Sequence, residues 1–234
     1  MNLIPGPVRR GVEASLGPLV ERLVAWHVSP NALTTVGTTV LAGGALAFGT
    51  GSVRLGAALL LLSGLFDMLD GRVARATGGT TTFGAFYDST LDRIGESALF
   101  LGIAAYFLQG GVVAAWRVAA VIIAVIALAG SLLVSYARAR AEGLDLECKV
   151  GIAQRAERIL GLGVPTLFFG AGPDGLLLLA LVSVLALVAC ITVVQRIVYV
   201  YRLTRSAPPP RTTQARRVTP PELAPYSGKG RRGE

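Results

Sequence analysis

The chain has 234 residues, of which 53% are hydrophobic and only 15% are charged, and its mean hydropathy is +0.61. This composition excludes an ordinary soluble globular protein and favours a polytopic membrane protein. The formal charge of +8 is typical of cytoplasmic loops that contact anionic lipid; no nucleic-acid partner is expected, because the sequence has no zinc-finger spacing or other nucleic-acid motif.

Residues 1–28 are predicted to form an N-terminal interfacial helix. Apolar side chains alternate there with arginine and glutamate, which is typical of an amphipathic helix on a membrane surface. Residues 29–205 are expected to form one transmembrane domain, which begins at Ser29-Pro30-Asn31 with Ser29 or Asn31 as the helix cap. Residues 206–234 are rich in Pro, Arg and Gly and are predicted to be a disordered basic tail.

Six membrane-spanning helices are predicted, so the expected fold class is all-α. Their approximate bounds are 32–48, 54–75, 82–108, 113–141, 151–170 and 176–201. Six spans put both termini on one side, and only Arg54 and Arg117 among the basic residues then lie at the opposite ends. The positive-inside rule therefore predicts a multi-pass protein of the cell membrane with both termini in the cytoplasm. Glycines and threonines in 32–48 suit close helix packing.

Four aspartates stand in and beside the apolar sequence of residues 66–93. Asp67 and Asp70 are three apart and Asp88 and Asp92 four apart, so each pair falls on one face of its helix. The twelve apolar and small residues 55–66 separate Arg54 from Asp67, which places Asp67 near the cytoplasmic side of a layer roughly 30 Å thick. Acids near hydrocarbon are rare unless they pair, bind a cation or face water. A metal site is therefore favoured over unrelated helix-end charges.

The ligand chemistry of this site indicates Mg²⁺, with Mn²⁺ as an alternative. Carboxylate oxygens are hard ligands, and the absence of a His/Cys cluster from the sequence argues against zinc. Such ions suit a diphosphate substrate, whose charge they neutralise during displacement by an alcohol. The alcohol also needs a proton acceptor, and the spacing alone leaves both Asp88 and Asp92 open for that role.

The order Asp67-x-x-Asp70-Gly71-x-x-Ala74-Arg75, followed after eight residues by Gly84-x-x-x-Asp88-x-x-x-Asp92, resembles the signature of the CDP-alcohol phosphotransferases. These are integral membrane enzymes of phospholipid synthesis, and the resemblance extends over about residues 29–205. It implies that the four aspartates hold the metal and that Asp92 is also the catalytic general base. It further implies a homodimer.

The same resemblance implies a binding site for the lipid donor, CDP-diacylglycerol. The residues that it assigns to this donor are Asn31, Ala32, Leu33, Thr34, Gly71, Ala74, Arg75, Thr81 and Gly84. From the residues alone, glycine at 71 is unfavourable inside a helix by about 1 kcal/mol, which is explained equally by a ligand or by a second helix that approaches closely.

Basic residues at other predicted cytoplasmic helix ends could converge into a phosphate site for the acceptor, because arginine offers paired donors to phosphate; these are Arg138, Arg140, Arg155, Arg158 and Arg196. The segments SYARARAE, QRAER and VQR are together similar to the actinobacterial phosphatidylinositol phosphate synthases. That similarity implies that Arg138, Arg158 and Arg196 bind the phosphate of inositol 1-phosphate, although each is also explained as a membrane-surface anchor. The sequence departs from the family at two positions, with arginine at 138, where lysine is frequent, and Ala156 in place of proline.

The expected activity is thus a magnesium-dependent transfer of a phosphatidyl group from CDP-diacylglycerol to inositol 1-phosphate. Glycerol 3-phosphate is the alternative acceptor. A divalent-cation transporter is the rival of another class, but its acids should lie near the midplane, whereas these lie toward one surface. A structural anchor for anionic lipid is a third alternative. Cys148 and Cys190 are expected to be free thiols.

Overall fold

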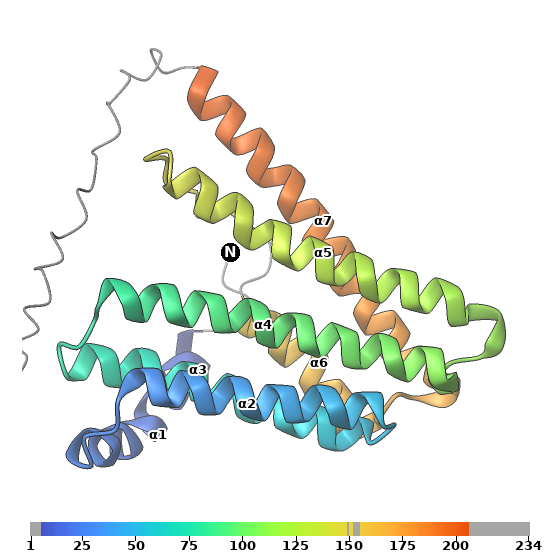
Figure 1. Cartoon of the computed structure of the whole chain (residues 1–234), viewed down its shortest axis with the longest axis horizontal. Coiled ribbons are helices and arrows are strands. Elements are labelled where there is room, and N and C mark those ends of the chain that lie inside the picture. Colours follow the sequence, from blue (N-terminus) through green and yellow to red (C-terminus); the bar gives the residue numbers. More distant parts are fainter. Residues whose placement is uncertain (1–5, 149, 152–154, 206–234) are drawn as a thin grey trace, which may run out of the picture.

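The computed structural model describes residues 6–148, 150–151 and 155–205, and within these ranges every regular element is a helix (Figure 1). The predicted all-α class is confirmed, while the predicted tail at 206–234 lies outside the described residues. The elements are α1 (Gly6–Ala25), α2 (Pro30–Gly49), α3 (Val53–Ala76), α4 (Thr82–Tyr106), η1 (Phe107–Gly111), η2 (Ala114–Trp116), α5 (Arg117–Glu142), α6 (Arg155–Phe169), η3 (Pro173–Gly175) and α7 (Leu176–Arg205).

Two hydroxyl caps fix the starts of α2 and α4. Ser29 Oγ accepts a hydrogen bond from the Ala32 amide at 3.2 Å, and Pro30 occupies the first turn of α2. Thr81 Oγ1 accepts from the Gly84 amide at 2.9 Å at the start of α4. Each cap satisfies a backbone donor that the helix itself leaves unpaired. Of the two caps expected for α2, the structure uses Ser29.

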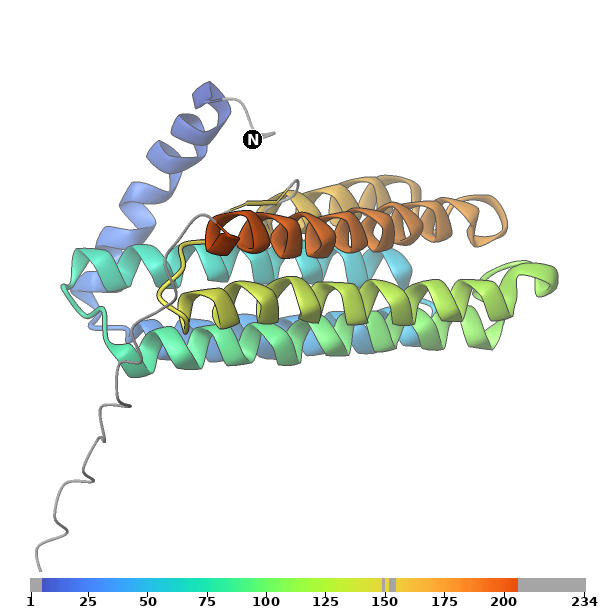
Figure 2. The same ribbon diagram turned by 90° about the horizontal axis from the view of Figure 1, so that it is seen from above.

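Helices α2 to α7 form a bundle in which α7 runs obliquely to the others (Figure 1), and α1 leaves the bundle at an angle at the end where α3 stops and α4 begins (Figure 2). Helix α2 packs along both α3 and α4 because small residues let the backbones approach. A Cβ atom on Gly37 would lie 2.8 Å from Phe66 Cβ, and one on Gly95 would lie 2.8 Å from Leu41 Cδ2. This close packing is what holds the two aspartate-bearing helices together.

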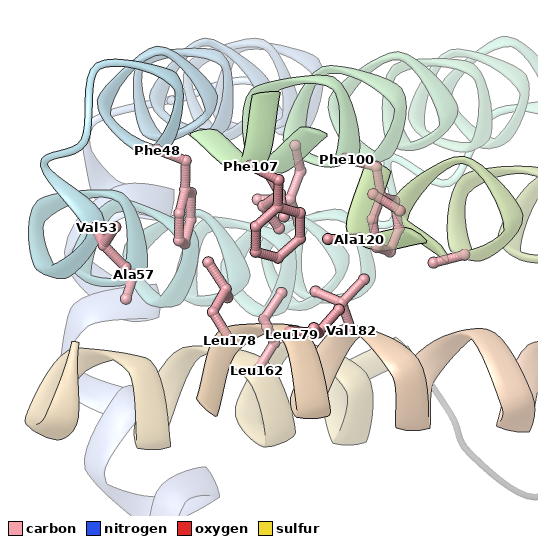
Figure 3. Close-up of a cluster of buried hydrophobic side chains, with 14 of the residues drawn as sticks. Phe48, Val53, Ala57, Phe100, Phe107, Ala120, Leu162, Leu178, Leu179 and Val182 are labelled. Carbon is pink, nitrogen blue, oxygen red and sulfur yellow. The ribbon is translucent and has the colours of Figure 1, made fainter. Parts of the chain in front are cut away.

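The main apolar core is built from side chains of α2 to α7 and extends from the middle of the bundle to the end where α2 stops and α3 begins; Figure 3 draws part of it. Phe48 at the end of α2 and Phe107 in η1 are fully buried there, together with Leu178 and Val182 of α7. A smaller cluster lies at the other end and joins α1 to α2 and α3; it comprises Leu33, Leu69 and Val73, with Leu16, Val20, Leu23 and Val24 of α1 packed against it. Residues Gly6–Ala25 are therefore helical, while the amphipathic and interfacial character expected for residues 1–28 stays a prediction.

Three helical segments in the described residues are long and apolar enough to cross a membrane: Pro30–Gly49, Ala114–Glu142 and Pro173–Arg205. The helices at the other three predicted spans are not both long and apolar enough to be counted with them, for physical reasons. Helices α3 and α4 carry the aspartates and nearby arginines, which lower their hydropathy, and α6 has only 15 residues in the described range. The protein therefore has membrane-like helices, and the count of six spans remains a proposal.

Candidate metal centre and its surroundings

Three of the four predicted aspartates form one carboxylate cluster. Asp67 and Asp70 on α3 and Asp88 on α4 each offer an oxygen, and these oxygens lie within 4.8 Å of one another. The predicted helical spacing brings this about, because α3 and α4 are consecutive and both pack on α2. Asp70 is buried, and Asp67 and Asp88 are half-buried.

The cluster fits a divalent cation. Asp88 Oδ1 is buried and has no hydrogen-bond partner among the described residues. An unpaired buried carboxylate oxygen beside two further carboxylates is costly, and a cation shared among the three would satisfy it. The donor set is all oxygen, which suits Mg²⁺ or Mn²⁺.

Asp92 lies next to this cluster and is linked to it through a shared arginine. Its carboxylate pairs with the Arg155 guanidinium of α6 and lies 3.4 Å from Arg93 Nη2. The same Arg155 Nη1 atom lies 3.2 Å from Asp67 Oδ1. Asp92 is therefore not among the three aspartates with mutually close oxygens, and its role as a metal ligand stays a prediction.

Arg155 is a cationic side chain that the structure brings to the aspartates of both α3 and α4, whereas the sequence argument counted it only among the basic residues of a possible phosphate site. It is the first arginine of the QRAER segment, one turn before Arg158. The signal was present in the sequence as a basic residue at the start of a helix. Its importance depends on the packing of α6 against α3, which local pattern does not reveal.

The three arginines expected to bind the acceptor have different environments. Arg158 donates to Ser131 Oγ at 2.6 Å and lies 3.1 Å from Glu96 Oε1. Arg196 donates to two backbone carbonyl oxygens, that of Val150 at 3.0 Å and that of Val134. Arg138 forms an exposed pair with Glu142 at 2.8 Å.

These arginines nevertheless share one region of the bundle. Arg196 interacts electrostatically with both Arg138 and Arg158, and Arg158 does so with Arg155. Arg155, Arg158, Ser131 and Glu96 also line one pocket, whose remaining walls are apolar side chains of the bundle. A zone of positive charge from α5, α6 and α7 thus adjoins the negative cluster on α3 and α4.

The residues expected to hold the donor fall into two groups around the hairpin. At the starts of α2 and α4, a Cβ atom on Gly84 would lie 3.0 Å from Thr81 Oγ1 and 3.4 Å from Asn31 Oδ1, so these three residues gather in one place. On α3, a Cβ atom on Gly71 would lie 3.4 Å from Arg75 Nη1. Among the described residues, the three atoms nearest to that position all belong to Arg75, so no described second helix packs closely against this glycine.

Four further residues assigned to the donor have different surroundings. Leu33 is buried in the cluster that contacts α1, and the hydroxyl of Thr34 donates to Asp70 Oδ2 at 2.7 Å. Ala32 is exposed beside them on α2, and Ala74 is half-buried on α3. These contacts therefore argue against direct contact of the Leu33 and Thr34 side chains with a ligand.

The chain is similar to known proteins in both sequence and structure. Residues 27–198 match the family described as CDP-alcohol phosphatidyltransferase. The archaetidylinositol phosphate synthase of Methanothermobacter thermautotrophicus is 37% identical over 202 residues, which is 86% of this chain and 94% of that protein. The phosphatidylinositol phosphate synthase of Cutibacterium acnes is 37% identical over 206 residues, covering 85% of this chain and 98% of that protein.

A third relative has known crystal structures. The phosphatidylinositol phosphate synthase of Mycobacterium tuberculosis with CDP-DAG bound superposes with a TM-score of 0.69 at 34% identity, over 79% of this chain and 92% of that one. The same protein in complex with manganese and citrate gives a TM-score of 0.69 at 34% identity, over 79% of this chain and 88% of that one.

Proposed function

The chain belongs to the CDP-alcohol phosphatidyltransferase family, and we propose that it transfers the phosphatidyl group of CDP-diacylglycerol to inositol 1-phosphate, giving phosphatidylinositol phosphate and CMP. The observation that carries this proposal is the cluster of Asp67, Asp70 and Asp88 with Arg155 beside it. The relatives named as inositol-phosphate lipid synthases support the choice of acceptor.

Asp67, Asp70 and Asp88 would hold the divalent cation, for which we propose magnesium. When bound, the cation would neutralise the diphosphate and polarise the phosphorus that is attacked. Asp92 would take the proton from the attacking inositol hydroxyl. As the new P–O bond forms, the bond between that phosphorus and the bridging oxygen of CMP breaks, and CMP leaves with the electron pair.

The donor would lie against the starts of α2 and α4. Asn31, Thr81 and Gly84 lie together at the starts of α2 and α4, and Gly71 follows the cluster residue Asp70 directly in α3 and lies beside Arg75. This supports their assignment to the CDP end of the lipid. Glycine at 71 and 84 keeps backbone surface open for a diphosphate.

The acceptor would enter over the positive zone on α5, α6 and α7. Arg138, Arg158 and Arg196 are proposed to attract its phosphate, and Arg155 to orient it toward Asp92. A guanidinium offers paired donors that match phosphate geometry, which suits this task.

We also propose that all six long helices α2 to α7 cross the cell membrane, with the aspartates and both termini at the cytoplasmic side. The polar site on α3 and α4 then lies at the inner surface, where a soluble inositol phosphate and a membrane lipid can meet. The protein is proposed to act as a homodimer, as the family resemblance implies.

Purified protein should be assayed with CDP-diacylglycerol and Mg²⁺ against competing acceptors. The expected result is CMP release and a phosphatidylinositol phosphate product with inositol 1-phosphate, and little CMP with glycerol 3-phosphate. CMP release with glycerol 3-phosphate but not inositol 1-phosphate would overturn the acceptor assignment. Divalent-cation transport into sealed vesicles without CMP formation would overturn the enzymatic proposal as a whole.

A further inference from the structure

The hydroxyl of Thr34 forms a buried contact with a carboxylate of the aspartate cluster. Thr34 Oγ1 donates to Asp70 Oδ2 at 2.7 Å, and both residues are only 7% exposed. Thr34 is on the first turns of α2 and Asp70 near the end of α3, so the bond crosses between two helices. The close packing of Gly37 against Phe66 on the same two helices holds these partners at this separation.

The hydroxyl has one proton and two acceptors within reach. Its other neighbour is the Pro30 carbonyl oxygen of its own helix at 3.1 Å. The contact with the carboxylate is shorter, and hydrogen bonds to ionised acceptors are roughly twice as strong as those to neutral ones. The proton is therefore directed at Asp70 Oδ2, which fixes the orientation of that carboxylate.

The cluster needs such an orienting bond. Asp70 is the most buried of the three aspartates, and a carboxylate that is free to rotate would present its oxygens to the cation in varying directions. Hydrogen bonds to the ligands of a metal orient them and tune their affinity, and removing one typically costs about 10- to 100-fold. A small pocket beside the cluster is lined by Thr34, Ser63, Asp67, Asp70 and Asp92, which places the Thr34 side chain within the site.

We infer that Thr34 is a positioning residue, which orients the carboxylate of Asp70 toward the divalent cation through its hydroxyl. This inference rests on the proposed function, because it needs the cation that the aspartates are proposed to hold. It differs from the part that the family resemblance gives Thr34, which is direct contact with the lipid donor. In this structure its hydroxyl is turned to Asp70, so it affects the donor through the metal site.

The test compares metal binding by full-length protein in detergent, measured from the loss of the free Mn²⁺ signal in electron paramagnetic resonance. Thr34→Val keeps the volume of the side chain and removes the hydroxyl, and Thr34→Ser keeps the hydroxyl. We expect Thr34→Val to raise the Kd for Mn²⁺ about 10-fold or more and Thr34→Ser to bind almost as the wild type does. Thr39→Val is the control, because the Thr39 hydroxyl donates to the Thr35 carbonyl oxygen of the same helix.

A second readout separates positioning from general damage. CMP release by Thr34→Val should need more Mg²⁺ for half-maximal rate, while the KM for CDP-diacylglycerol at saturating Mg²⁺ stays near the wild-type value. A raised KM for the lipid with unchanged Mn²⁺ affinity would instead support direct donor contact and overturn the inference. If Thr34→Val does not fold, Thr34→Ala and Thr34→Ser form the test pair, and equal Mn²⁺ affinity in these two also overturns it.

The Asp70→Asn variant distinguishes a wrong role for Thr34 from a wrong proposal for the metal site itself. If Asp70→Asn loses Mn²⁺ binding while Thr34→Val does not, Thr34 has no positioning role and the metal site stands. If Asp70→Asn also binds Mn²⁺ as the wild type does, the proposed metal site itself is wrong.

Discussion

The guanidinium of Arg155 forms an ion pair with the carboxylate of Asp92 and thereby joins the first turn of α6 to α4. The same nitrogen lies 3.2 Å from Asp67 Oδ1 on α3. One cation from the second half of the bundle thus touches both aspartate-bearing helices. It lies between a carboxylate that is proposed to hold the metal and the carboxylate that is proposed to accept the proton, and this position is the reason why we propose that it orients the acceptor phosphate.

Replacing Arg155 should weaken acceptor binding more than donor binding. A hydrogen bond to a charged group contributes about 1.5–3 kcal/mol, so Arg155→Gln should raise the KM for inositol 1-phosphate about 10- to 100-fold. Arg155→Lys should recover part of this loss, since it keeps the charge but not the paired donors. Steady-state CMP release with each substrate varied in turn measures both KM values. Arg205→Gln, at the exposed end of α7, is the control, and an unchanged KM for inositol 1-phosphate in Arg155→Gln would contradict the assignment.

Asp88→Asn should impair metal binding. The substitution removes the negative charge of the residue whose Oδ1 is buried without a partner among the described residues. Even changes that only affect groups behind the ligands cost about 10- to 100-fold in metal affinity, so loss of this carboxylate should cost at least as much. Titration of CMP release with Mg²⁺ gives the half-saturating concentration. Ser89→Ala should titrate like the wild type, because the Ser89 hydroxyl bonds to the Phe86 carbonyl oxygen of its own helix.

Asp92→Asn should abolish turnover while leaving metal binding largely intact. Asp92 is outside the group of three aspartates with mutually close oxygens, and a general base contributes about 100- to 10,000-fold to rate. We therefore expect kcat to fall by that order and the Mn²⁺ Kd to stay near that of the wild type. A loss of Mn²⁺ affinity as large as that in Asp88→Asn would show that Asp92 is a principal ligand, and unchanged turnover would remove it from the mechanism.

The features that sequence could predict are those set by local pattern. The Ser29 cap, the helix starts and the pairing of Asp67 with Asp70 follow from neighbours within one or two turns. The turn between α3 and α4 is short, so the approach of Asp88 to that pair also followed from chain order. Each of these features depends on residues within one helix or on the short turn between two consecutive helices.

The features that sequence could not predict depend on contacts between distant helices. Arg155 reaches Asp67 and Asp92 because α6 packs on α3, and nothing in QRAER distinguishes it from Arg158. Likewise, the turn that carries Leu33 and Thr34 was assigned as a whole to the donor. The packing of α1 and α3 against α2 buries Leu33 and turns Thr34 to Asp70.

The buried pair of Arg158 and Glu96 should matter for stability. Their side chains are 15% and 13% exposed and lie 3.1 Å apart, and Arg158 also bonds to Ser131, so α4, α5 and α6 meet at this point. Removing one partner of a buried pair leaves an uncompensated charge and costs about 3–5 kcal/mol. Glu96→Gln should therefore lower the unfolding temperature of the detergent-solubilised protein clearly.

Glu142→Gln is the matched control for this prediction. Its pair with Arg138 has the same chemistry at 2.8 Å, but both side chains are about half exposed, at 50% and 51%. Exposed pairs contribute about 0–1 kcal/mol, so this variant should unfold close to the wild-type temperature. Equal losses in the two variants would show that burial does not set the contribution of these pairs.

The orientation of the bundle can be tested with single cysteines at its two ends. Ser52 follows α2 and Thr77 follows α3, both are exposed, and the proposed topology places them on opposite sides of the membrane. In a background with Cys148 and Cys190 replaced by alanine, Ser52→Cys should react with a membrane-impermeant maleimide in intact cells. Thr77→Cys should react only in inverted vesicles, because α3 carries the chain across the bilayer and the positive-inside rule keeps the aspartate end in the cytoplasm. Labelling of both positions from the same side would mean that α3 does not span, and reversed labelling would place the aspartates, and with them the proposed acceptor site, outside the cell.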